Sequence, residues 1–232
     1  MNSVECTINY LGVIINSDDI NNILSPEYNN NENPKYRILE KFLNLPLQCL
    51  PREVLERYIE ITMKETYTPI FPISEKLFEN LLTPLKSAKR CYCLEEYIAT
   101  IELSAHLGEM LAILIWKMIK INGKTIALRL EKKLLGDTID KSWQAKRIEA
   151  LDDLGAIKGN HVEILNFLRK TRVKYFHWWS HTIENAKQDA MKCFMKVSKL
   201  IKEIVQIEIK DGAIKMNPLL DAYIKEHRVT NS

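Results

Sequence analysis

The segment from residue 172 to residue 181 has the residue types most suited to chemistry in this sequence, RVKYFHWWSH. Arg172 has a permanently charged, planar guanidinium that suits phosphate. His177 carries an imidazole, the side chain whose unperturbed pKa lies closest to neutral pH, so it can both accept and donate a proton. RNA supplies its own nucleophile, the ribose 2′-OH, and therefore needs only a proton acceptor and a cation facing the phosphoryl oxygens. The two residues predict RNA cleavage without a metal ion or another cofactor.

Neighbouring side chains of the same segment are candidates for supporting this chemistry. Trp178 and Trp179 could stack on unpaired bases, although aromatic rings at the end of a helix more often pack in a core or a dimer interface. The candidates for RNA binding are Lys170, Lys174, Trp178 and Trp179, and the candidates for supporting the site are Tyr175 and His181.

His181 follows His177 by four residues, so a continuous helix would place both imidazoles on one face, as metal ligands can lie. No carboxylate follows at a useful spacing, and Glu184 is the nearest. We therefore expect no metal here and place His181 near the mouth of a cleft or on the exposed surface.

A second group of ionisable residues lies in the apolar segment 94–121. Glu102, His106 and Glu109 are spaced i, i+4, i+7, so a helix would align them in one stripe. An apolar helix should not bury such a stripe without partners. The stripe therefore either faces the cluster, pairing with Arg172 and orienting His177, or forms a plain solvent face. If one acid joins the site, we expect Glu109, which lies nearest the most apolar part of the segment.

The elements that must position these residues are predicted to be helices, in an all-α bundle with an N-terminal accessory helical segment. A helical pattern begins at Lys35, and further helices are expected at 51–66, 74–82, 94–121, 124–135, 141–154, 161–175, 182–207 and after Asn217. A β-like alternation covers 7–15, the Asn-rich tract that ends at 29–34 is expected to be a loop, and Pro84 is expected to break a helix. The predicted division is an accessory segment at 1–90, a helical core at 91–210, and a short helix and tail at 211–232.

Helix geometry limits how Arg172 and His177 can act together. Five residues of a straight helix rotate by about 500°, which leaves the two side chains roughly 140° apart and about 7.5 Å apart along the axis. They converge only if the helix ends near His177, if the Arg172 side chain wraps, or if a second protomer completes the site. In the alternative interpretation, Arg172 pairs with a nearby acid and His177 is a core or interface histidine.

The charge distribution favours a polyanionic partner near the cluster. The first 34 residues contain five acidic and no basic residues, whereas residues 169–210 contain ten Lys and Arg against four acidic residues. Basic charge is thus concentrated around and after Arg172, where RNA would dock. For the part beyond Lys187, a solvated lysine-rich helix face is an equally good interpretation.

The composition indicates a globular protein of the cytoplasm. It is 46% hydrophobic and 27% charged, as is usual for soluble domains. The five cysteines are scattered without zinc-ligand spacing, which predicts free thiols in a reducing compartment. The N-terminus lacks the basic region of a secretory signal, and the most apolar stretch, 110–116, is short for a membrane span. We therefore expect no membrane association.

The sequence from Leu168 to His177, LRKTRVKYFH, resembles the signature of the HEPN superfamily, in which four to six residues separate an Arg from a His. The resemblance covers roughly residues 92–208. It implies a compact α-helical domain with metal-independent endoribonuclease activity, often in toxin–antitoxin or antiviral defence. It also implies a homodimer with a composite active site, in which His177 is the general acid and base and Arg172 holds the scissile phosphate. The resemblance further implies an antitoxin or another regulatory protein as a partner.

One residue departs from the family pattern. Many active members have Asn, Asp or His directly after the Arg, whereas this chain has Val173. Two alternatives to a ribonuclease therefore stay open: a non-catalytic module of the same fold that binds RNA or a partner protein, and a structural or regulatory bundle without nucleic-acid contact. No Gly-rich phosphate loop or other catalytic motif points to a different class of enzyme.

Overall fold

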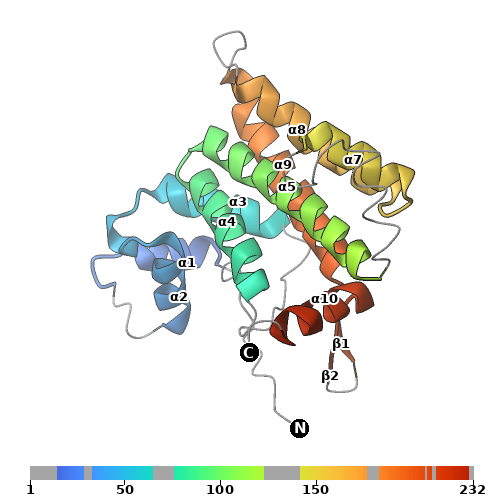
Figure 1. The fold of residues 1–232 in the computed structure, drawn as a ribbon. Coiled ribbons are helices and arrows are strands. Elements are labelled where there is room, and N and C mark those ends of the chain that lie inside the picture. The colour runs from blue at the N-terminus through green and yellow to red at the C-terminus, as the bar shows by residue number, and fades with distance from the viewer. Residues whose placement is uncertain are drawn as a thin grey trace. The chain divides into compact units, whose positions relative to one another are not determined.

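The computed structural model of the chain describes residues 15–28, 33–64, 76–122, 142–176, 183–206, 208–210 and 213–229. The expected all-α fold is confirmed (Figure 1). The described helices are α1 (Ser17–Ile23), α2 (Pro34–Leu43), α3 (Arg52–Lys64), α4 (Lys76–Cys93), α5 (Tyr97–Asn122), α7 (Gln144–Asp153), α8 (Gly159–Phe176), α9 (Ala186–Val205) and α10 (Pro218–Val229), with short 3-10 turns at Leu47–Cys49 and Ile183–Asn185. The helix expected at 124–135 and the alternation at 7–14 lie outside the described residues.

Contacts between residues divide the chain into two compact units. The first consists of Met1–Leu103 and Thr182–Met195, and the second of Ser104–His181 and Lys196–Ser232. The first unit contains α1 to α4, and the second contains α7, α8 and α10 with most of α5.

The core of the first unit forms where α3 packs on α4 (Figure 1). The two helices bury apolar side chains at helical spacing, among them Leu55, Ile61, Leu85 and Ala88. Lys89 is fully buried, and its ammonium lies 5.0 Å from the ring centroid of Tyr58, so a cation–π contact offsets part of the cost of its burial.

Two expectations for the first unit were wrong. Pro84 lies inside α4 and does not end it, because the buried face of the helix continues on both sides of the proline and outweighs the one backbone hydrogen bond that it removes. The N-terminal region also contains a helix, α1, that we did not expect. The side chain of Asn16 accepts a hydrogen bond from the Asp19 backbone, and Asp19 returns one to the Asn16 backbone, each at 2.9 Å. This capping box, together with buried Ile20 and Ile23, stabilises α1.

The second unit is built on α5 and α8, with α7 packed along α8 (Figure 1). The turn between α7 and α8 is closed by Gly155, whose φ of 62° belongs to the left-handed region. The backbone N–H of Ala156 donates to the Leu151 carbonyl at 2.9 Å, which completes a Schellman motif. The turn fixes where the first residues of α7 lie relative to α8.

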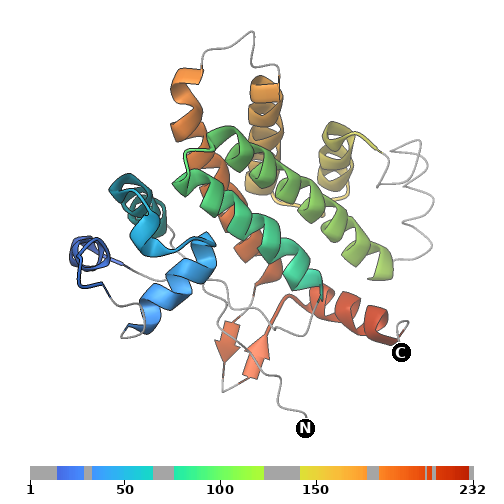
Figure 2. The same ribbon diagram turned by 90° about the vertical axis from the view of Figure 1, so that its left-hand side faces the viewer.

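A short β-hairpin in the second unit was not expected. The strands β1 (Glu208–Lys210) and β2 (Ala213–Lys215) are antiparallel, with Ile209 opposite Ile214 (Figure 2). Three residues are too few for an alternating pattern to stand out. The signal that could have revealed the hairpin is Asp211-Gly212, a dipeptide typical of two-residue hairpin loops.

The segment Tyr97–Ile121 of α5 is, by length and composition alone, long and apolar enough to cross a membrane. Of its most apolar 18-residue window, 56% is buried within the protein. The cytoplasmic location stays a prediction.

Candidate functional site

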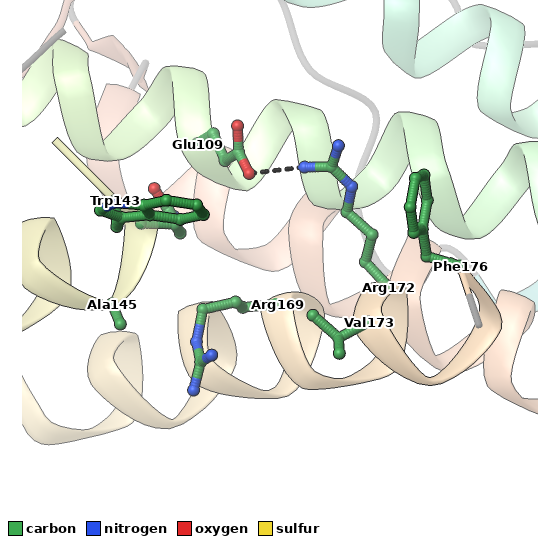
Figure 3. A pocket seen from close by; sticks show the side chains of 8 residues that line it. Glu109, Trp143, Ala145, Arg169, Arg172, Val173 and Phe176 are labelled. Carbon is green, nitrogen blue, oxygen red and sulfur yellow. Dashed lines mark hydrogen bonds and ion pairs between the residues drawn. The ribbon is translucent and has the colours of Figure 1, made fainter. Parts of the chain in front are cut away.

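The crossing of α5 and α8 brings Arg172 to a carboxylate. A Cβ on Gly108 would lie only 2.9 Å from Cδ1 of Leu168, so the missing side chain allows the two helices to approach closely. Leu168 and Arg172 are one helical turn apart on α8, and Glu109 follows Gly108 on α5. The Arg172 guanidinium donates from Nη1 to Oε1 of Glu109 at 2.7 Å (Figure 3).

An open hollow of about 330 Å³ lies beside this ion pair. It is lined by Glu109 of α5, by Trp143, Gln144 and Ala145 at the start of α7, and by Arg169, Arg172, Val173 and Phe176 of α8. The four α8 residues follow an i, i+3, i+4, i+7 spacing and therefore share one face of that helix. Figure 3 shows Trp143 and Phe176 on opposite sides of the Arg172 side chain.

Large apolar side chains of the hollow are left in contact with water. Trp143 is 82% exposed and Phe176 is 65% exposed. Val173, the residue that departs from the family pattern, is 49% exposed and lies in the same wall. Exposed apolar side chains that gather at one hollow are typical of a binding site, whereas single ones are ordinary.

Polar groups of the hollow give it a net positive character. Arg169 and Arg172 contribute two cations, and Glu109 is the one acid among the lining residues. Arg169 extends away from Glu109 in Figure 3. Its Nε and the Oε1 of Gln144 are buried and have no hydrogen-bond partner within the described part of the chain.

The other predicted residues of α8 lie outside the hollow. Lys170 is exposed. Tyr175 is buried, and the ammonium of Lys174 lies 4.8 Å from the centroid of its ring, a cation–π contact on the surface of α8. Neither Lys174 nor Tyr175 lines the hollow.

Four predicted residues, His177, Trp178, Trp179 and His181, lie outside the described residues, so the predicted angle between Arg172 and His177 is not tested. In the sequence, His177 directly follows Phe176, the last described residue of α8 and part of the hollow.

The stripe on α5 divides between its two interpretations. Glu109 pairs with Arg172, as expected both by the first interpretation and by the alternative in which Arg172 pairs structurally with a nearby acid. His106 is exposed, and Glu102 is half-buried. The stripe as a whole therefore does not face the segment that contains Arg172. Among its three residues, Glu109 contacts Arg172.

Residues that sequence reasoning missed are Gly108, Trp143, Gln144, Arg169 and Phe176. The helical spacing of Arg169 and Phe176 from Arg172 could have revealed those two residues. Trp143 and Gln144 come from another helix, and no sequence pattern joins them to α8.

Within the described residues, no group of three or more His, Cys, Asp or Glu side chains is placed so that it could hold a metal ion. Comparison of the sequence and fold with protein-family models, curated proteins and solved structures finds no match.

Proposed function

We propose that this chain is a metal-independent endoribonuclease of the HEPN type, which cleaves RNA by attack of the RNA's own 2′-OH. The observation that carries the proposal is the Arg172–Glu109 pair in the wall of an open, net positive hollow. Phe176, which also lines this hollow, directly precedes His177 in the sequence. The Arg172 side chain is 37% exposed, so a phosphate can approach it from solvent.

In the proposed reaction, His177 accepts the proton of the ribose 2′-OH, and the 2′ oxygen attacks the neighbouring phosphorus. The bond from phosphorus to the 5′ oxygen of the next nucleotide breaks, and this oxygen takes up a proton from an imidazolium. The products are a 2′,3′-cyclic phosphate and a 5′-hydroxyl. Arg172 stabilises the charge that develops on the phosphoryl oxygens.

Glu109 has a positioning role in this proposal. A carboxylate that accepts a hydrogen bond from Nη1 restricts the rotamers of the long Arg172 side chain, and a held guanidinium loses less entropy when phosphate binds. A structural Arg–Glu pair would have the same geometry, so activity measurements must separate the two.

The proposal includes a homodimer, because helix geometry separates Arg172 from His177 within one protomer unless the helix ends near the histidine. A cytoplasmic defence or toxin–antitoxin setting, with an antitoxin or regulatory protein as a further partner, follows from the family resemblance.

The second candidate function is a non-catalytic module that binds RNA. The observation that favours it is Val173, an apolar side chain exposed in the hollow where active relatives have a polar residue. In this alternative the hollow binds RNA and Arg172 only contacts phosphate.

Cleavage of a mixed pool of single-stranded and structured RNA in EDTA tests the proposal. We expect wild-type protein to cut, and Arg172→Ala and His177→Ala to lose at least a hundredfold in rate. Arg52→Ala is the matched control, because Arg52 is an exposed arginine of α3 whose side chain binds Asn21. Absence of cutting by folded wild-type protein would overturn the proposal. Salt-sensitive RNA binding without cutting would then favour the binding module.

A further inference from the structure

The hollow beside Arg172 has features that the cleavage chemistry does not use. Neither Arg172 nor His177 needs an aromatic platform, yet Trp143 supplies one at the start of α7. An indole that is 82% exposed leaves a large apolar face in water, and this face is available to a flat ligand.

The size of the hollow limits its occupant. Ligand pockets usually measure about 300–1,000 Å³, and a hollow of about 330 Å³ lies at the lower end of that range. A hollow of this size accommodates one nucleobase with part of its ribose, whereas a nucleic-acid duplex or a protein helix needs a longer groove.

Charge sets where the phosphate of the same strand would lie. Arg172 lies beside Trp143 in the wall of the hollow, so a base that stacks on Trp143 has a cation near it for its backbone (Figure 3). Aromatic platforms combined with arginines are how proteins bind single-stranded nucleic acid.

We propose that the hollow is a subsite for one unpaired nucleobase of the RNA, which stacks on Trp143 with its backbone phosphate beside Arg172. The inference rests on the proposed function in one respect, namely that RNA is the ligand. Such a subsite requires the RNA to be single-stranded at this position, because a base that is paired in a duplex cannot enter the hollow. Stacking strength grows with ring area, so a purine is preferred.

Binding of short 2′-O-methyl RNA, which cannot be cleaved, tests the inference with the full chain. Fluorescence anisotropy compares an oligomer that has a purine at one position with the same oligomer that has an abasic ribose there. We expect wild-type protein to bind the abasic oligomer about tenfold more weakly, the loss of one base stack.

Trp143→Ala should weaken binding of the purine oligomer about tenfold and remove the difference between the two oligomers. Trp143→Phe should keep most of the difference, because a smaller aromatic ring still stacks. Met63→Ala is the matched control, since Met63 is another large apolar side chain that is 72% exposed, on α3. Met63→Ala should leave the binding of both oligomers unchanged.

Equal binding of both oligomers, or unchanged binding by Trp143→Ala, would overturn the inference even if wild-type protein cleaves RNA. Base-dependent binding that needs Trp143, without any cleavage in EDTA, would support the inference and overturn the nuclease. Absence of RNA binding by wild-type protein would overturn the inference and leave the exposed aromatic side chains as a surface for a protein partner.

Discussion

Arg172 and Glu109 form an ion pair that is 37% and 27% exposed, and pairs of this kind contribute about 1 kcal/mol or less to stability. In the proposed enzyme, this ion pair therefore serves to orient the guanidinium and contributes little to the stability of the fold. A substitution of Glu109 should accordingly change the rate of catalysis more than the stability.

Glu109→Gln is expected to lower kcat for RNA cleavage about tenfold and to change KM by less than about twofold. The amide keeps the shape of the side chain but holds the Arg172 guanidinium less firmly. The melting temperature should stay nearly the same. Steady-state kinetics with thermal unfolding checks this, and an unchanged kcat would make the Arg172–Glu109 pair purely structural.

At this scale the sequence predicts part of the candidate site. The preference for Glu109 as an acidic partner agrees with its contact with Arg172, because helical spacing and apolar surroundings restrict which acid can lie beside α8. Trp143 and Gln144 could not be predicted, since they depend on how the turn at Gly155 returns the chain along α8. The roles of Arg172 and His177 stay predictions.

The crossing of α5 and α8 is tightly packed at Gly108. A Cβ on Gly108 would also lie 3.6 Å from Cδ2 of Leu165, in addition to its 2.9 Å approach to Leu168. A methyl group at this position would therefore require the Leu168 side chain to shift.

Gly108→Ala is expected to reduce the free energy of unfolding by about 1 kcal/mol, because overpacking costs roughly 1–3 kcal/mol and the gain in helix propensity offsets about 1 kcal/mol. Gly159→Ala is the matched control, since a Cβ there has no atom within 4 Å. Urea unfolding of both variants checks the prediction. Equal stabilities would mean that the crossing tolerates a methyl group.

A tyrosine next to α2 makes the stability of the first unit depend on pH in the alkaline range. Burial, followed by the charge of the neighbouring Glu40 carboxylate, raises the pKa of Tyr28 to about 12. An unfolded tyrosine ionises near pH 10. The folded state therefore keeps the neutral phenol longer, and this contribution to stability is present below pH 10 and lost as the pH rises towards 12.

Tyr28→Phe should make the free energy of unfolding less dependent on pH between pH 9 and 11, where wild-type protein loses stability because its unfolded state releases this proton. Urea unfolding at stepped pH values measures the slope. An identical slope for both proteins would contradict the raised pKa.

The helices were largely predictable, and the exceptions have physical causes. Apolar spacing identified α3, α5, α7, α8 and α9 within a few residues. A local rule failed at Pro84, where tertiary packing outweighs the cost of a proline. The helix α1 was hidden because seven residues rich in Asn and Asp have low helix propensity, and a capping box with two buried isoleucines compensates for it.

For the whole molecule, the proposed function requires two protomers if Arg172 and His177 act in one centre from different chains. Homodimers usually have twofold symmetry, so each interface would contain two such centres. Two variants that are each inactive should therefore regain activity when they form mixed dimers.

An equimolar mixture of Arg172→Ala and His177→Ala, unfolded and refolded together, should regain about a quarter of wild-type cleavage. Half of the dimers are then mixed, and each mixed dimer holds one intact centre. The rate of the mixture is compared with the rates of the separate variants. No regained activity from a mixture that forms mixed dimers would place both residues in one protomer.

The chemistry of the cut ends tests the central claim most directly. Wild-type protein is incubated in EDTA with an oligoribonucleotide and with the same oligomer carrying a 2′-deoxy sugar at the cleaved position, and mass spectrometry identifies the termini. The account predicts 2′,3′-cyclic phosphate and 5′-hydroxyl ends from the first oligomer and no cut in the second. Cleavage of the 2′-deoxy oligomer, or no cleavage of either, would contradict it.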